Sequence, residues 1–339
     1  MGRQWLANIG KTDSGVVSVS SLFADEKIYW PVNFEPYTPA HHFEGGKEDP
    51  KFRTKLKIAA RLVEQSVEEG IPFRAVVADS FYGEDEGFKR SLSELGVGYV
   101  LALKPSHAWW HKVGEVGSPW EAAVAAGEGW EDERRPGEWV KVVRSFRDGH
   151  EEAWWALEVD VGPYYGPQRT RRAVVATTDP QRLPEKATWY LVSNLPHPDS
   201  ELATGSELAP VHLSEIVRLY GLRMWVEQGY KQVKHVLGWS DYQVRSDIAI
   251  RRHWELVCCA FSFCWWAYGR LPTDGPSQAE NDLPNEQEGR GKKEATPGIL
   301  AGGLEGGKGV VGAVDNAMAI VEGVLRDAPT TAAKSKSAA

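Results

Sequence analysis

The feature that most constrains the fold is an alternation of helix-like and strand-like stretches in the first third of the chain. Phe52–Glu69 has the apolar spacing of an amphipathic helix, and Phe73–Ala78 is a short apolar run typical of a buried strand. The pattern repeats as a helix predicted over Glu84–Leu95 and a strand over Gly98–Leu103. Asp79 directly follows the first of these strands, where open α/β sheets commonly face a ligand. This order predicts an α/β sheet with helices on its faces.

Strand-like runs flank this core on both sides. Val16–Phe23 alternates apolar and polar residues, and Ile28–Val32 predicts a partner strand, whereas residues 1–10 look polar and irregular. Residues 106–206 are rich in Trp and contain strand-like runs separated by Gly, Pro and charged turns. These runs are Trp139–Phe146, Ala153–Asp160, Arg172–Thr177 and Thr188–Ser193. We expect a β-rich region here.

A long helix is predicted over Leu213–Leu237. Tyr220, Arg223, Glu227 and Lys234 follow one another at spacings of 3, 4 and 7, so they share one face of a 3.6-residue helix. An aromatic ring, a carboxylate and two cations on one face suit an acid that holds a metal beside a phosphate. The plainer interpretation is a solvated helix on which Glu227 pairs with Arg223 or Lys231, each four residues away.

The same four residues carry a resemblance. Tyr220-x2-Arg223-x3-Glu227-x6-Lys234 is similar to the Y-x2-R-x3-E-x6-K signature of bacterial insertion-sequence DDE transposases. Further segments resemble the 701-type branch of that family and spread over residues 1–268: RQWLANIGK, FRTKLKIAARLVEQSVEEGIPFRAVVADSFYG, YVLALKP and WSDYQVRSDIAIRRHW. The resemblance implies a ribonuclease-H-like α/β fold with a β-rich insertion, residues 106–206, between the second and third acidic residues. This insertion either covers one edge of the site or contacts DNA ends.

The resemblance also implies roles for residues. Asp79 and Glu227 would be the second and third catalytic acids and metal ligands of a two-metal site holding Mg²⁺ or Mn²⁺. Arg223 and Lys234 would hold DNA phosphates, and Tyr220 would lie against the DNA backbone. The alternative for Asp79 is a helix N-cap or turn residue before Gly83.

A basic cluster follows the predicted signature helix: Arg245, Arg251 and Arg252. It is either a solvated helix end or a further phosphate contact, and we expect the contact. The expected partners are therefore DNA, as the terminal inverted repeats of an element and its target, with a homo-oligomer possible on that DNA.

One part of the family pattern has no counterpart here. The first Asp of the family lies on a first strand that precedes the segment similar to RQWLANIGK, and this chain starts just before that segment. Asp13 and Asp25 align with a loop and a turn. The resemblance therefore predicts a truncated or remnant transposase, in which metal affinity and catalytic rate are severely reduced and the neighbours of the missing strand are left unpaired. The alternatives are a non-catalytic DNA-binding fragment that inhibits an intact transposase, and an unrelated α/β hydrolase or binding module.

Composition sets further expectations. The formal net charge of −8 is unusual for a DNA-binding chain, so DNA contact requires a local basic patch. The three cysteines, Cys258, Cys259 and Cys264, suggest buried thiols in a reducing cytoplasm. They lie in the apolar run Trp254–Tyr268, which is shorter than the roughly 20 residues of a membrane span. We therefore expect a cytoplasmic, nucleoid-associated protein with no membrane contact.

The predicted organisation has four segments. Residues 1–105 and 207–270 form the two parts of the catalytic domain, residues 106–206 form the insertion, and residues 271–339 form a low-complexity, mostly disordered tail. Within that tail, residues 310–325 have the pattern of a weak amphipathic helix.

Overall fold

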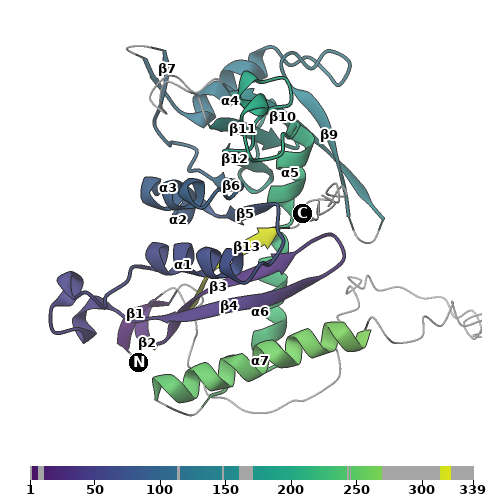
Figure 1. The fold of residues 1–339 in the computed structure, drawn as a ribbon. Coiled ribbons are helices and arrows are strands. Elements are labelled where there is room, and N and C mark those ends of the chain that lie inside the picture. Colours follow the sequence, from purple (N-terminus) through teal and green to yellow (C-terminus); the bar gives the residue numbers. More distant parts are fainter. Residues whose placement is uncertain are drawn as a thin grey trace, which may run out of the picture. The chain divides into compact units, whose positions relative to one another are not determined.

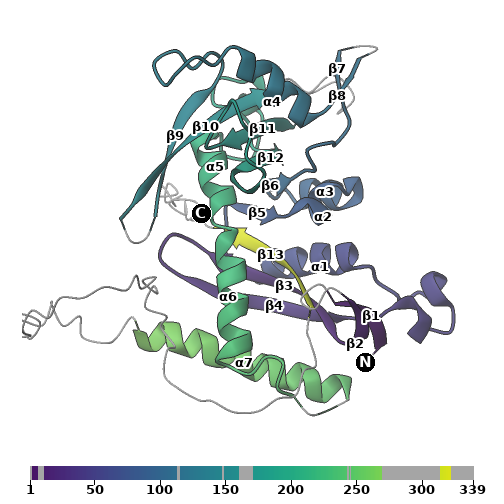
Figure 2. The ribbon, with the colours of Figure 1, turned by 180° about the vertical axis from the view of Figure 1, so that it is seen from behind.

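The computed structural model describes residues 2–6, 11–112, 115–146, 149–159, 171–242, 244, 246–268 and 314–321. The chain divides into two compact units that interleave along the sequence. The first unit comprises Met1–Glu69, Phe81–Ser91 and Leu222–Ala319, and the second comprises Gly70–Ser80, Leu92–Gly221 and Ile320–Ala339. Figures 1 and 2 show the elements of both units from opposite sides. None of the helices in the described ranges has the length and apolar character needed to cross a bilayer.

The first unit is built on an antiparallel hairpin of β3, Val17–Ala24, and β4, Tyr29–Tyr37. All residues of β3 are buried, as expected for a strand that is covered on both faces. Helix α1, Lys55–Glu68, packs on one face (Figure 1), and its first turn is capped by the Thr54 hydroxyl, which accepts a hydrogen bond from the Lys57 amide. The two predicted strands and this helix are confirmed, although β4 is longer than expected.

Two helices cover the other face of the hairpin: α6, Met224–His235, and α7, Asp247–Tyr268. Gly229 of α6 lies so close to β3 that an added Cβ would stand 3.2 Å from a methyl group of Leu22. This absence of a side chain lets α6 pack directly on the strand.

The predicted long helix over Leu213–Leu237 is wrong in one respect, because two helices form there. Helix α5, Leu213–Gly221, ends before Leu222, and α6 begins at Met224. The amides of Trp225 and Val226 donate to carbonyls three residues back, a tighter spacing than that of an α-helix. Gly221, a weak helix former, stands at the break.

Two further predictions differ from the structure in the first unit. Residues 2–6 are not irregular but form strand β1, Gly2–Leu6, which pairs antiparallel with β2, Lys11–Gly15. Val314–Val321 forms strand β13 rather than a helix, and β13 lies next to β3 on the side opposite β4. The expectation of an unpaired edge beside β3 is therefore wrong, because backbone hydrogen bonds to β13 occupy that edge.

The second unit contains a mixed sheet of six strands in the order β5-β6-β12-β11-β10-β9. β5 and β6 are parallel, and every later neighbour is antiparallel. The strands are β5, Ala75–Ala78; β6, Tyr99–Ala102; β9, Val140–Ser145; β10, Glu151–Val159; β11, Arg172–Thr177; and β12, Thr188–Ser193. This confirms the predicted strands of the insertion, all of which lie within the second unit.

Helices and a small hairpin complete the fold. They are α2, Ser80–Gly83; α3, Glu86–Glu94; α4, Pro119–Glu128; and the paired strands β7, Trp109–Lys112, and β8, Glu115–Gly117. Helix α4, which packs on β10 and β11, was not predicted, although the sequence holds its start signal. Ser118 and Glu121 form a capping box, with Pro119 in the first turn.

An ion pair of the buried Arg172 with Glu158 links the insertion to the segment that leads into α5. The Arg172 guanidinium donates to both carboxylate oxygens of Glu158, at 2.7 and 2.6 Å. It also donates to the backbone carbonyl of Val211 at 2.7 Å, and its side chain is only 8% exposed. The buried guanidinium is therefore well satisfied by hydrogen bonds, while its partner Glu158 is 36% exposed.

Candidate functional site

Helix α6 presents Glu227 to solvent. The Arg223 guanidinium donates to the Glu227 carboxylate at 3.2 Å, and the two side chains are 27% and 64% exposed. The pair has the i, i+4 spacing of an ordinary helix-surface ion pair. Such an exposed pair contributes little to stability, so Glu227 can exchange Arg223 for a ligand with little loss of free energy.

Lys234 lies on the same face of α6. Its ammonium group is 5.2 Å from the centre of the Tyr230 ring. The Tyr230 hydroxyl is in turn hydrogen-bonded to the Ser20 hydroxyl of β3, which anchors the ring to the hairpin. Arg223, Glu227, Tyr230 and Lys234 follow one another at spacings of 4, 3 and 4, so they form one helical stripe. We call these four residues the α6 face.

Sequence reasoning missed Tyr230, although its position gave a signal. It lies three residues after Glu227 and four before Lys234, so the helical period alone places it between them. Its ring sits between the ammonium group of Lys234 and β3, and thereby holds Lys234 near the hairpin.

The arginines of the basic cluster differ in what the structure describes of them. Arg251 donates to Asp247 at 2.9 Å on the first turns of α7, and its side chain is 37% exposed. Arg252 is exposed. Arg245 lies outside the described residues. The structure therefore leaves the prediction of phosphate contacts by this cluster open.

Asp79 and Tyr220 belong to the second unit. Asp79 stands directly after β5 and before α2, and it is half-buried, so the predicted position at a strand end is confirmed. Tyr220, at the end of α5, is only 8% exposed, and its ring packs edge-on against Trp189 at 5.0 Å. A direct DNA contact by Tyr220 stays a prediction, and in this structure the ring packs inside the second unit.

The residues of the signature thus fall into two groups. The α6 face brings Arg223, Glu227 and Lys234 together within the first unit, whereas Asp79 and Tyr220 belong to the second. A metal site shared by Asp79 and Glu227 stays a prediction. Over the described part of the chain, no group of three or more His, Cys, Asp or Glu side chains forms a ready-made metal cluster. The two carboxylates are nevertheless hard oxygen donors of the kind that Mg²⁺ and Mn²⁺ prefer.

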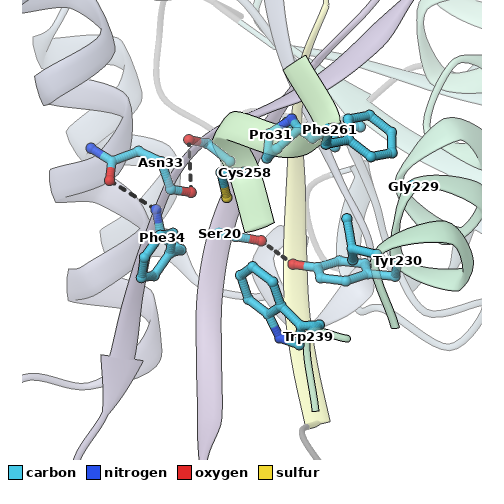
Figure 3. A pocket seen from close by; sticks show the side chains of 12 residues that line it. Ser20, Pro31, Asn33, Phe34, Gly229, Tyr230, Trp239, Cys258 and Phe261 are labelled. Atoms are coloured by element: carbon cyan, nitrogen blue, oxygen red, sulfur yellow. Dashed lines mark hydrogen bonds between the residues drawn. The ribbon is translucent and has the colours of Figure 1, made fainter. Parts of the chain in front are cut away.

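A small cavity lies in the first unit beneath the α6 face (Figure 3). Its lining comes from β3, β4, α6 and α7 and is mainly apolar, and the Ser20 and Tyr230 hydroxyls meet beside it. Its volume of about 20 Å³ has room for roughly one water molecule. It is therefore a packing defect of the core and not a substrate site.

The thiol of Cys258 also lines this cavity. Burial raises the pKa of this thiol to about 12, and the neighbouring Cys259 and Glu255 add to the shift. Cys259 is exposed, so the prediction that all three thiols are buried is wrong. The helical period explains the difference, because adjacent residues of α7 point about 100° apart.

Two comparisons with known proteins bear on this geometry. Residues 1–159 match the family model of the DDE superfamily endonucleases. Over 243 residues, the chain is 32% identical to a protein of Microchaete diplosiphon named "Probable transposase for insertion sequence element IS701". That alignment covers 71% of this chain and 54% of the relative, so the chain spans about half the length of the curated relative.

These findings define the class of protein. The two matches support an insertion-sequence DDE transposase, of the DDE superfamily endonuclease family. Within that class it is similar to the IS701 transposase, which confirms the family that the signature residues suggested. The mixed α/β architecture is consistent with the predicted ribonuclease-H-like fold of DDE nucleases.

Proposed function

We propose that this chain binds DNA and takes part in the cutting and joining of strands by an insertion-sequence transposase. The observation that carries the proposal is the α6 face, on which an exposed carboxylate, Glu227, stands among Arg223, Tyr230 and Lys234. Family membership supports it, because DDE nucleases generally use acidic residues and divalent metal ions on DNA. The proposed partners are the terminal inverted repeats of an element and its target DNA, bound by a homo-oligomer at the nucleoid.

Each residue has a proposed role. Asp79 and Glu227 provide oxygen donors for Mg²⁺ or Mn²⁺, which when bound would activate the attacking oxygen and stabilise the leaving one. Arg223 and Lys234 hold phosphates near the carboxylate, and Arg245, Arg251 and Arg252 extend this contact along the backbone. Glu227 starts in an exposed pair with Arg223, so a phosphate that attracts Arg223 also releases the carboxylate.

Strand cleavage tests the catalytic part of the proposal. The full chain is incubated with Mg²⁺ or Mn²⁺ and duplexes that carry the DNA flanking its gene, and nicking is measured on a sequencing gel. Because carboxylate ligation of a catalytic metal contributes several kcal/mol to the transition state, Glu227→Gln and Asp79→Asn should each lower the rate roughly 100-fold or more.

The matched control is Glu64→Gln. Glu64 is also an exposed helix carboxylate paired with an arginine, Arg61, at 2.7 Å, but it lies on α1. We expect cleavage by this variant to equal that of the wild type. Cleavage that is indifferent to both Asp79 and Glu227 would overturn the assigned roles.

A non-catalytic DNA-binding role is the second candidate. It is favoured by the cations of the α6 face, whose contacts with Glu227 and Tyr230 do not involve Asp79. Under this alternative, the wild type binds the same duplexes with a strong salt dependence but cleaves none of them. Added to an intact transposase of the same element, it would then reduce cleavage in proportion to its occupancy of the ends.

A further inference from the structure

An aromatic box in the second unit encloses one cation. The guanidinium carbon of Arg144, on β9, lies 4.8 Å from the Phe146 ring centre, 5.0 Å from that of Trp154 and 4.7 Å from that of Trp189. The side chain is only 12% exposed, and the Glu152 carboxylate lies 3.9 Å away. Burial lowers the pKa of Arg144, and Glu152 opposes the shift. The planar group is therefore held mainly by its faces, through cation–π contacts.

The box closes on the last residue of α5. A Cβ added to Gly221 would stand 2.5 Å from Arg144 Nη2 and 3.0 Å from its guanidinium carbon. Real side chains do not approach so closely, so the guanidinium occupies the place where any other residue would put its side chain. A side chain at position 221 would therefore displace the guanidinium from the box, and Gly221 leaves the space that it occupies. Helix α5 packs on β9 and β10 around this contact.

The same box contacts the signature tyrosine. Trp189, whose face covers Arg144, packs against the Tyr220 ring at 5.0 Å and against Trp154 at 4.1 Å. Tyr220 and Gly221 are adjacent, so Arg144 constrains the tyrosine twice, through the Trp189 ring and through the backbone of Gly221. An insertion that only covered the edge of a sheet would need neither of these contacts.

We propose that Arg144 is a positioning residue of the insertion, which fixes the signature Tyr220 and the end of α5 through its aromatic box and Gly221. The insertion thereby orients part of the signature in addition to extending the sheet. An effect of Arg144 on DNA binding rests on the proposed function, whereas its effect on the position of Tyr220 does not.

Nitration of tyrosines by tetranitromethane, resolved by peptide mass spectrometry, tests the position of Tyr220 without DNA. In Arg144→Met, nitration of Tyr220 should rise roughly fivefold, the factor expected when one buried cation–π contact is lost. Tyr99, fully buried on β6 of the same unit, is the internal control and should stay unreactive. Equal rises at Tyr220 and Tyr99 would mean general loosening, and no rise at Tyr220 would mean no positioning; either result overturns the proposal.

Gly221→Ala tests the route through the backbone. Its Cβ should displace the guanidinium and raise Tyr220 nitration as Arg144→Met does. Because both variants break one contact, the double variant should be no more reactive than either single one. Additive effects would show two unrelated sites. Arg144→Lys should not restore protection, since an ammonium group cannot stack on three rings, and full protection by Lys would refute the role of the planar group.

DNA binding separates positioning from direct contact. Fluorescence anisotropy with a labelled duplex from the flanking DNA should show weaker binding by Arg144→Met, with an unchanged slope of log K against log salt. A slope reduced by about one would indicate a lost phosphate contact at Arg144 itself and would overturn the positioning role. If the wild type binds no DNA, the proposed function fails, while the nitration result still decides the position of Tyr220.

Discussion

The Arg172–Glu158 pair of the second unit and the Arg223–Glu227 pair of the first join the same side-chain types in opposite surroundings. Arg172 is 8% exposed, and Glu158 accepts two hydrogen bonds from it at 2.7 and 2.6 Å. Glu227 is 64% exposed and lies 3.2 Å from the Arg223 guanidinium. In the first pair the arginine is buried and hydrogen-bonded within the fold, and its glutamate is 36% exposed. In the second pair most of the carboxylate faces water.

This difference separates stabilising charges from charges that are free to serve a ligand. A buried arginine with several hydrogen bonds cannot leave without exposing unpaired groups, so such a pair is fixed. An exposed pair contributes at most about 1 kcal/mol and exchanges its partner readily. The same reasoning divides the signature, because Tyr220 is buried in the second unit while Arg223 and Glu227 are accessible in the first.

The largest expected effect on stability comes from removing Arg172, the buried member of the Arg172–Glu158 pair. Arg172→Met removes the partner of Glu158 and the donor to the Val211 carbonyl. The Val211 carbonyl then lacks its donor, whereas the Glu158 carboxylate, which is 36% exposed, is partly rehydrated, so we expect the free energy of unfolding to fall by about 2 kcal/mol. Urea denaturation followed by circular dichroism measures this change.

Arg182→Met is the matched control. Arg182 is 86% exposed and lies 3.8 Å from Asp179 in the same unit. Its replacement should change the unfolding free energy by less than about 0.5 kcal/mol. Similar losses in both variants would show that burial does not distinguish these pairs and would break the comparison.

The local patterns of the sequence predicted most elements but not the contacts between distant ones. Thr188–Ser193 and Arg172–Thr177 were predicted with their observed limits, because apolar alternation between turn residues is a local signal. Asp79 was likewise placed by the strand before it. The apposition of Arg144 and Gly221, 77 residues apart in the chain, has no local signature, since it depends on how α5 packs on β9.

Two other differences between the predicted and the observed elements have physical reasons. The apolar period of 3.6 continues through Gly221–Arg223, so periodicity alone could not show that α5 and α6 are separate. Strand β13 was missed because its pairing with β3 joins two ends of the chain, and a register of this kind is set by the partner strand. Residue spacing thus predicted three members of the α6 face, Arg223, Glu227 and Lys234, but it missed Tyr230 and grouped the buried Tyr220 with them. The burial of each side chain could be known only from the folded chain.

A smaller effect is expected from the thiols of α7, where a partly buried and an exposed cysteine are adjacent. Burial raises the pKa of Cys258 to about 12, well above its ordinary value near 9. Above pH 9 the unfolded chain loses this proton while the folded chain retains it, so the folded state binds more protons and its stability falls as the pH rises. Between pH 8 and 10 the contribution of Cys258 should decrease by about 1 kcal/mol. It is measured as the stability difference between wild type and Cys258→Ala.

Val257→Ala provides a non-titrating reference for that measurement. Val257 is 4% exposed on the same turn of α7, so its loss costs packing alone. The difference between this variant and the wild type should stay constant over the same pH range. A constant difference for Cys258→Ala as well would show that this thiol is as accessible as an exposed one.

The smallest effect on stability should come from the exposed pair, and it should be accompanied by an effect on DNA. Arg223→Ala removes one contact of 3.2 Å from a carboxylate that remains hydrated, so the unfolding free energy should change by less than about 0.5 kcal/mol. The affinity for a flanking-DNA duplex should fall several-fold, and the slope of log K against log salt should decrease by about one, as for the loss of one phosphate contact. Anisotropy titrations at several salt concentrations measure both quantities, with Arg61→Ala on α1 as the control that leaves them unchanged. A destabilised Arg223→Ala variant with unaltered DNA binding would assign this exposed pair to the fold and contradict the contrast with Arg172–Glu158.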